Sequence, residues 1–260
     1  MIGEVDSDEM SEPKILASDL DLTRGRRRVL QGLSLAIPKG TTALVGVNGA
    51  GKTTLMNVLA GALRPSAGSV LIAGHDPYAR RSRRRALTSV ALMPQNVSFP
   101  RTMTAHDVVT HLGWLRGLSG SVAARRADDA LGAVGLGDRR TTRIGHLSGG
   151  MKRRVALAQA LVAEPEVLLL DEPSTGLDPE QRIVMVDLLK SLSATTLLSS
   201  HVMEDVTAVA DRVIVLHEGT ARFQGTLTEL KCLAPDGTDA HRAVEAGFIA
   251  AISGSPGPSR

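Results

Sequence analysis

The stretch Gly46-Val47-Asn48-Gly49-Ala50-Gly51-Lys52-Thr53-Thr54 decides the fold of this chain. It fits the pattern G-x-x-x-x-G-K-[ST], in which glycines let the backbone turn until successive N–H groups point at phosphate oxygens. Residues 42–45 before it are typical of a short buried strand, and residues 54–61 after it are typical of a helix with one apolar face. This strand–loop–helix order predicts an α/β fold with a triphosphate-binding loop.

Lys52 and Thr53 give the predicted loop its chemistry. The Lys52 ammonium supplies a point charge for the β- and γ-phosphates, and the Thr53 hydroxyl supplies a ligand for Mg²⁺. The helix start adds unpaired N–H donors and the positive end of its dipole. A glycine-rich turn before an ordinary core helix is the alternative, but it does not require the sequence Gly-Lys-Thr-Thr. We therefore expect residues 46–54 to hold a nucleoside triphosphate.

A second site is predicted where an apolar run, residues 167–170, ends in Asp171 and Glu172. A run that is apolar on both faces is typical of a central strand in a parallel sheet, and ligands bind at the carboxyl ends of such strands. Asp171 is the expected partner of Mg²⁺. Glu172 is expected to orient or deprotonate the water that attacks the γ-phosphate. A solvated pair of acids at a strand end is the alternative.

Further features follow strand ends or precede a helix, and they are Gln95, Ser148-Gly149-Gly150, the turn residue Asp178, and His201. Gln95 can reach both Mg²⁺ and the water. The Ser-Gly-Gly triplet presents N–H groups and a hydroxyl to an anion at a helix start. A lone Gln or His is usually structural, so the interpretation depends on the order of these features along the chain.

In this order the motifs resemble those of the nucleotide-binding domain of an ABC ATPase, where they are called Walker A, Q-loop, signature, Walker B, D-loop and H-loop. The resemblance spans residues 15–230, which is the expected ABC ATPase domain. It implies a P-loop NTPase (RecA-like) core with a parallel central sheet, an antiparallel β subdomain and an α-helical subdomain at about 101–153. Residues 231–260 are expected to form a C-terminal tail that is partly disordered.

The resemblance also implies a mechanism that needs two copies of the chain. In a head-to-tail pair, expected to be a homodimer, Ser148, Gly149 and Gly150 of one copy contact the γ-phosphate held by residues 46–54 of the other. ATP then joins the copies, and hydrolysis releases them. The roles implied for the remaining residues are general base or water-orienting group for Glu172, γ-phosphate sensor for His201, contact to water and Mg²⁺ for Gln95, and cross-dimer contact for Asp178.

Two positions depart from the family pattern. Met151 stands in the signature where Gln is commonest, and Met cannot donate the same hydrogen bond; the variant resembles that of bacterial exporters. Arg24 lies where the family usually has an aromatic that stacks on adenine. A guanidinium can also stack on a π face, so the way in which the base is held stays open.

Composition and charge narrow the choice of partners. The net charge is +3, and the basic residues include arginine clusters at residues 26–28 and 80–85. Only one Trp, one Tyr and three Phe are present, so no base-stacking surface for nucleic acid is expected. We interpret the arginine clusters as solvated faces, since no aromatic interleaves them.

The sequence predicts a peripheral location. No apolar run approaches the roughly 18 residues of a membrane span, and the acidic N-terminus lacks a signal-peptide pattern. Cys232 is the single cysteine, which fits a reducing compartment. We expect the chain at the cytoplasmic face of the cell membrane, bound to a separate transmembrane permease subunit.

The leading interpretation is therefore an ATP-binding and ATP-hydrolysing subunit that powers an ABC membrane transporter, an exporter of a drug, lipid or similar cargo. An importer ATPase is one alternative, and a soluble ABC ATPase that acts on ribosomes or DNA is another. Soluble types usually carry two cassettes or a long heptad insertion, and this chain has neither. The intact set Lys52, Gln95, Asp171, Glu172 and His201 disfavours a purely structural nucleotide binder. The cargo, the direction of transport and the identity of the permease stay open.

Overall fold

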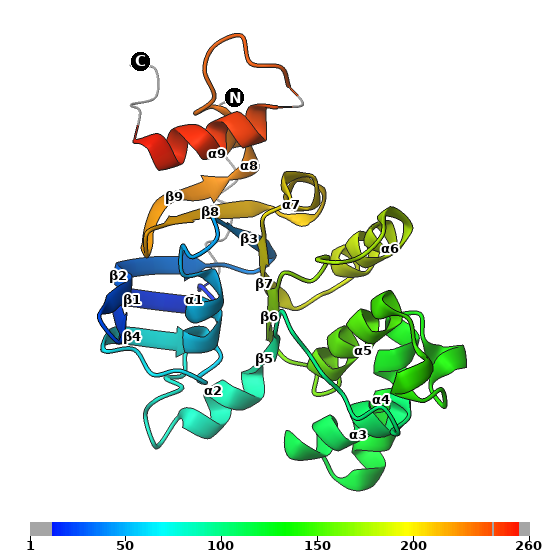
Figure 1. The fold of residues 1–260 in the computed structure, drawn as a ribbon. Coiled ribbons are helices and arrows are strands. Elements are labelled where there is room, and N and C mark those ends of the chain that lie inside the picture. Colours follow the sequence, from blue (N-terminus) through cyan, green and yellow to red (C-terminus); the bar gives the residue numbers. More distant parts are fainter. Residues whose placement is uncertain (1–11, 241, 255–260) are drawn as a thin grey trace, which may run out of the picture.

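A computed structural model of the chain describes residues 12–240 and 242–254, which form two β-sheets with helices around them (Figure 1). The first sheet is antiparallel and has the strand order β2-β1-β4. Its strands are β1 (Ile15–Arg24), β2 (Arg27–Ile37) and β4 (Ala67–Ile72). Buried residues alternate with more exposed ones along β1 and β2, as expected for strands with one face on the core.

The second sheet has six strands in the order β5-β6-β7-β3-β8-β9. Their bounds are β3 (Thr41–Val45), β5 (Val90–Met93), β6 (Val167–Asp171), β7 (Thr195–Ser200), β8 (Arg212–His217) and β9 (Thr220–Thr226). All neighbouring strands from β5 to β8 pair in parallel, and β9 pairs antiparallel with β8. The predicted α/β class, with a parallel central sheet and a separate antiparallel sheet, is confirmed.

The parallel strands bury both faces because their alternate side chains enter two different cores. Leu44 of β3 and Leu169 of β6 belong to the core that contains α1 (Lys52–Leu59) and the antiparallel sheet. Val45 and Leu170 belong to the other core, with the helices α5 (Gly149–Leu161) and α6 (Pro179–Lys190). This burial on both sides explains why residues 167–170 are apolar without alternation.

Helices α3 (Ala105–Leu115) and α4 (Gly120–Ala133) lie beside α5, away from the antiparallel sheet (Figure 1). A capping box of Thr104 and Asp107 begins α3, since each side chain bonds the backbone N–H of the other. Within α3, Val108 and Val109 are buried, whereas Leu115 is 61% exposed. The limits of a helical subdomain, about 101–153, stay a prediction.

The remaining helices are α2 (Arg83–Ser89), α7 (Met203–Val209), α8 (Leu227–Lys231) and α9 (Ala243–Ser253). Helix α9 lies within residues 231–260, where the sequence predicts a C-terminal tail that is partly disordered. It packs so near α8 that a Cβ on Gly247 would lie 2.0 Å from the carbonyl oxygen of Leu230. Most of the acidic N-terminus and the last residues of the predicted tail, 255–260, lie outside the described residues. In the part of the chain that is described, no helix combines the length and apolar character that crossing a membrane requires.

Candidate nucleotide-binding site

The predicted phosphate loop connects β3 to α1 at the carboxyl edge of the central sheet. Gly51, the N-cap of α1, has φ 110°, in the left-handed region that favours glycine. Gly46 has no room for a side chain, because a Cβ there would lie 2.3 Å from the carbonyl oxygen of Leu216. No side chain caps α1, so the N–H groups of its first turn are available to an anion.

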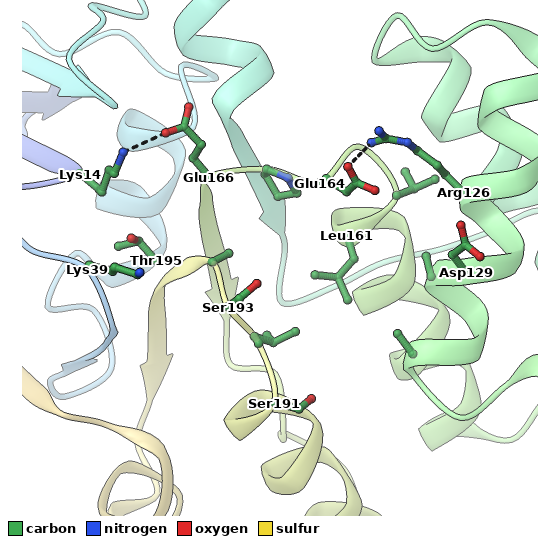
Figure 2. Close-up of a pocket in the computed structure, with 16 residues that line it drawn as sticks. Lys14, Lys39, Arg126, Asp129, Leu161, Glu164, Glu166, Ser191, Ser193 and Thr195 are labelled. Carbon is green, nitrogen blue, oxygen red and sulfur yellow. Dashed lines mark hydrogen bonds and ion pairs between the residues drawn. The ribbon is translucent and has the colours of Figure 1, made fainter.

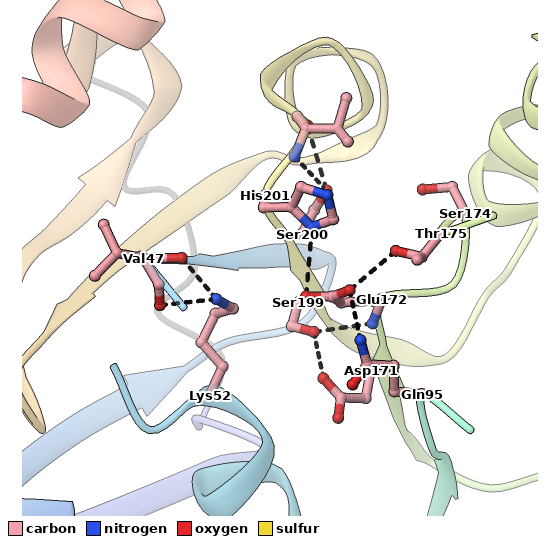
Figure 3. A network of polar contacts seen from close by, with 12 residues as sticks. Val47, Lys52, Gln95, Asp171, Glu172, Ser174, Thr175, Ser199, Ser200 and His201 are labelled. Carbon is pink, nitrogen blue, oxygen red and sulfur yellow. Dashed lines mark hydrogen bonds and ion pairs between the residues drawn. The ribbon is translucent and has the colours of Figure 1, made fainter. Parts of the chain in front are cut away.

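Lys52 is folded back onto this loop and is only 7% exposed. Its Nζ donates to the carbonyl oxygens of Gly46 at 2.6 Å and of Val47 at 3.3 Å (Figure 3). Burial lowers the pKa of the Lys52 ammonium, and the carboxylates of Glu172 and Asp171 oppose that shift. The loop therefore holds the Lys52 ammonium against its own backbone carbonyl oxygens, and a cation at this place can attract an anion.

A cleft of about 560 Å³ lies in front of the loop. Its lining residues come from the loop, from the two predicted catalytic segments and from the β1–β2 hairpin; they are Arg24, Arg27, Val29, Asn48, Gly49, Gly51, Lys52, Thr53, Thr54, Gln95 and Glu172. The structure thus brings Gln95 and Glu172 to the phosphate loop. It also places Arg24 in the cleft, the residue that stands where the resembled family usually has an aromatic for adenine.

The carboxylate of Glu172 is the centre of a polar network (Figure 3). Its Oε2 accepts hydrogen bonds from Gln95 Nε2 at 2.9 Å and from Thr175 Oγ1 at 3.0 Å. Its Oε1 lies 3.4 Å from Nδ1 of His201. Glu172 therefore contacts both Gln95 and His201, two residues that are far from it in the sequence and were predicted to act with it.

Asp171 is deeper than Glu172 and is only 2% exposed. Its Oδ1 accepts a hydrogen bond from Ser199 Oγ at 2.6 Å, and the same hydroxyl accepts from the backbone N–H of Glu172 at 2.9 Å. Glu172 has φ +50°, a conformation that a non-glycine residue keeps only when its surroundings impose it. Ser199 is thus one of the groups that fix the acidic pair.

Ser148 caps α5, its hydroxyl accepting from the N–H of Met151 at 3.2 Å. A Cβ on Gly149 would meet open space, whereas one on Gly150 would lie 1.7 Å from Oε1 of Gln181. None of these three residues lines the cleft in front of α1. Asp178 caps α6 by accepting from the N–H of Gln181 at 2.9 Å. Since Gln181 lies against Gly150, the predicted signature and D-loop are next to each other, and neither lines the cleft in front of α1.

Sequence reasoning missed several polar groups of the site, among them Thr175, Ser199 and Arg153. A further missed group is Asp205 of α7, which is buried, accepts from Ser174 and lies 2.5 Å from Nε of Arg182. These are common residue types in ordinary elements, and no local pattern distinguishes them. They act through contacts between segments that only the fold brings together.

A larger groove, of about 750 Å³, lies at the amino ends of β6 and β7, beside α4 (Figure 2). Its charges are largely paired, with Lys14 2.9 Å from Glu166 and Arg126 2.7 Å from Glu164. No residue predicted to bind nucleotide lies there. Since ligands of open parallel sheets bind at the carboxyl ends of the strands, the smaller cleft is the candidate site.

The sequence of the chain is similar to that of known ATP-binding proteins. A family model described as ABC transporter matches residues 30–175. The chain is 37% identical over 230 residues to a daunorubicin resistance ATP-binding protein of Streptomyces coeruleorubidus, covering 85% of this chain and 71% of that protein. It is 32% identical over 218 residues to a linearmycin resistance ATP-binding protein of Bacillus subtilis, covering 82% and 70%. A Nod factor export ATP-binding protein of Burkholderia lata is 38% identical over 205 residues, covering 77% and 67%.

Solved structures give the same result for the fold. The protein cbiO1 of Clostridium perfringens, part of the ABC transporter complex cbiONQ, superposes with a TM-score of 0.74 at 30% identity, covering 85% of this chain and 91% of that one. An ATP-binding subunit of another ABC transporter superposes with a TM-score of 0.73 at 26% identity, covering 84% and 91%. The chain therefore belongs to the ABC transporter family, as an ATP-binding subunit that hydrolyses ATP.

Proposed function

We propose that the chain powers an exporter at the cytoplasmic face of the cell membrane, in complex with a separate transmembrane permease. The direction is supported by relatives whose names assign them to drug resistance and to Nod factor export. We extend to this chain a cargo of the same kind, a drug-like or lipid-like small molecule. These names favour export over the importer and the soluble ATPase that the sequence left open.

The proposed chemistry depends on the contacts that Glu172 makes with Gln95, Thr175 and His201. In the cleft, a water molecule in line with the γ-phosphate would lie beside a carboxylate that Gln95 and Thr175 orient. Glu172 accepts or attracts a proton of this water as it attacks. His201 lies 3.4 Å from Glu172, and we propose that it donates to the γ-phosphate, whose charge Lys52 neutralises.

The residues predicted to hold Mg²⁺ offer only oxygen atoms, from the Thr53 hydroxyl, the Gln95 amide and the Asp171 carboxylate. This set fits Mg²⁺, which proteins bind through one or two carboxylates together with substrate phosphates and water. The described residues contain no group of three or more His, Cys, Asp or Glu side chains that could hold a metal by themselves. We infer that the ion enters with ATP. When bound, it neutralises charge on the phosphate oxygens.

We propose that a second copy of the chain completes the site. The start of α5 offers backbone N–H groups and the positive end of a helix dipole, but it lines no part of the cleft of its own chain. In a head-to-tail homodimer, Ser148, Gly149 and Gly150 would contact the γ-phosphate held by the partner. Asp178, next to the start of α5 through Gln181, would lie at the same interface.

The test is a tagged Glu172→Gln variant, trapped with ATP in the native cells and purified from membranes. A polytopic membrane protein that co-purifies, and that raises the ATPase rate of the wild-type chain when both are placed in vesicles, would support the transporter proposal. Ribosomes or DNA without a membrane protein would contradict it. Direction is tested with the reconstituted pair and fluorescent daunorubicin: ATP-dependent movement away from the side of the ATPase supports export, and movement toward it supports import.

A further inference from the structure

Arg153 lies at a junction of the loops that surround the candidate site. It is on α5, one turn after the Ser-Gly-Gly triplet, and it is half-buried. Its guanidinium donates hydrogen bonds to four backbone carbonyl oxygens, those of Gln95, Asp171 (3.1 Å), Glu172 and Pro173 (3.0 Å). One side chain of the signature helix thus contacts both the Q-loop and the loop after β6.

The topology of the sheet explains why these carbonyl oxygens need a donor. Strands β5 and β6 are parallel neighbours, and Met93 pairs with Leu170 near their carboxyl ends. Beyond that point β5 has ended, so Asp171 at the end of β6 and the residues of both loops lack partners between these two strands. The planar guanidinium has five N–H donors in a fixed fork, so it can serve two loops at once. Burial lowers the pKa of Arg153, while Asp171 and Glu172 oppose the shift.

The two loops carry the side chains that orient the attacking water. Gln95 Nε2 donates to Glu172 Oε2 at 2.9 Å, so the relative position of their backbones decides whether this bond forms. Glu172 also has φ +50°, which requires support from its surroundings. Arg153 supplies part of that support, since it bonds the carbonyl oxygen of Glu172 itself and those of both its neighbours.

We propose that Arg153 is a positioning residue that connects the start of α5 to the Gln95–Glu172 pair of the same subunit. It bonds backbone oxygens and not the reacting groups, so it acts through Gln95 and Glu172. The inference rests on the proposed function, in which the start of α5 contacts the triphosphate of a second copy. A shift of α5 on that contact moves Arg153 and with it the backbone of both loops. The site that a subunit offers to its partner is thereby coupled to its own catalytic site.

The test compares Arg153→Lys and Arg153→Gln with the control Arg154→Lys in the full chain. Arg154 is the next residue of α5, and its guanidinium also bonds carbonyl oxygens, those of Val134 and Gly135 at 3.3 Å, but these lie in the helical region. Lysine keeps the positive charge of arginine but lacks the planar set of guanidinium N–H donors. Steady-state phosphate release gives kcat and KM, binding of a fluorescent ATP analogue gives the affinity, and thermal unfolding reports the folded fraction.

We expect kcat of Arg153→Lys to fall about 10- to 100-fold, the cost of a displaced catalytic group, with KM and nucleotide affinity within about threefold of wild type. Arg154→Lys should keep wild-type kcat. If Arg153→Lys destabilises the fold, the test uses Arg153→Gln, which keeps two N–H donors. Its kcat is then calculated per folded molecule. Wild-type kcat in the residue 153 variants, or a fall in kcat matched by an equal fall in affinity or in folded protein, would overturn the inference.

The wild type and Glu172→Gln separate this inference from the proposed function. If the wild type hydrolyses ATP, Glu172→Gln does not, and the residue 153 variants are as active as wild type, then only the positioning role is wrong. If Glu172→Gln hydrolyses ATP at the wild-type rate, the proposed chemistry itself is wrong.

Discussion

The starts of α1 and α5 are both rich in glycine and look alike in the sequence, but the structure builds them differently. The N-cap of α1 is Gly51, which leaves the first N–H groups uncapped, and they face a cleft that also contains Lys52 and Glu172. The N-cap of α5 is Ser148, whose hydroxyl is already bonded to the N–H of Met151. The start of α5 does not line the cleft in front of α1.

The difference teaches that a helix dipole and free N–H groups do not make a triphosphate site by themselves. The start of α1 has a cation, a hydroxyl and a carboxylate within one cleft of the same chain, from Lys52, Thr53 and Glu172. The start of α5 offers backbone N–H donors, but it lies outside this cleft. Variants at the two helix starts should therefore have different effects. Those at α1 should change the affinity for nucleotide, and those at α5 should change turnover without changing the affinity of the single chain.

The largest effect is expected from Glu172→Gln. The amide retains the shape of the carboxylate but cannot accept a proton from the attacking water, so kcat should fall about 10²- to 10⁴-fold. The affinity for ATP should stay within about threefold, and the ATP-bound dimer should accumulate, as size-exclusion chromatography would detect. Glu245→Gln, at an exposed acid of α9, is the control. Turnover within tenfold of wild type would refute the role of Glu172.

Gly149→Asp tests the start of α5. A Cβ there meets open space, so the fold should tolerate the change, while the carboxylate repels the partner's triphosphate. We expect kcat to fall about 10²-fold, as for loss of a preorganised donor, with unchanged ATP affinity of the single chain by calorimetry. Gly132→Asp is the matched control, since Gly132 is also helical with nothing near a Cβ. Weakened ATP binding in the monomeric variant would show that α5 serves the cleft of its own chain.

Lys52→Ala tests the start of α1. Removing a hydrogen bond to a charged group costs roughly 1.5–3 kcal/mol, so ATP affinity measured by calorimetry should fall about 10- to 150-fold. Lys39→Ala removes a lysine from the groove of Figure 2 and should leave the affinity unchanged. Equal affinities of the two variants would mean that the cleft in front of α1 is not where ATP binds.

The smallest effect is expected at Arg24, which lines the cleft in front of α1. A stacked guanidinium is worth about 0.5–1 kcal/mol at an exposed site, so Arg24→Ala should weaken ATP binding about two- to fivefold. GTP binding should fall equally, because both purines offer a π face. Arg26→Ala, in the same hairpin but outside the cleft, is the control. If only the affinity for ATP fell, Arg24 would contact the polar edge of the adenine base and not its face.

The parts of the site that could be predicted are those in which residue type and local spacing are themselves the chemistry. The phosphate loop needs glycines, a lysine and a hydroxyl in adjacent places. The acidic pair needs a buried strand before it. Arg153, Ser199 and Asp205 could not be found in this way, since an arginine on a helix, a serine in a strand and an aspartate in a short helix are ordinary. Ser199, for example, is 27 residues from Glu172 in the sequence. Only packing brings such residues to their partners.

The sequence by itself therefore determined the phosphate loop, the apolar central strands and the order of the motifs, because each depends on hydrogen bonding or side-chain direction within a few consecutive residues. The tertiary structure decided which of these motifs meet. It placed Gln95, Glu172 and His201 within hydrogen-bond or ion-pair distance, put Arg24 in the cleft, and kept the start of α5 apart from it. Such distances follow from the parallel pairing of β5, β6, β7 and β3, which aligns the carboxyl ends of strands far apart in the chain.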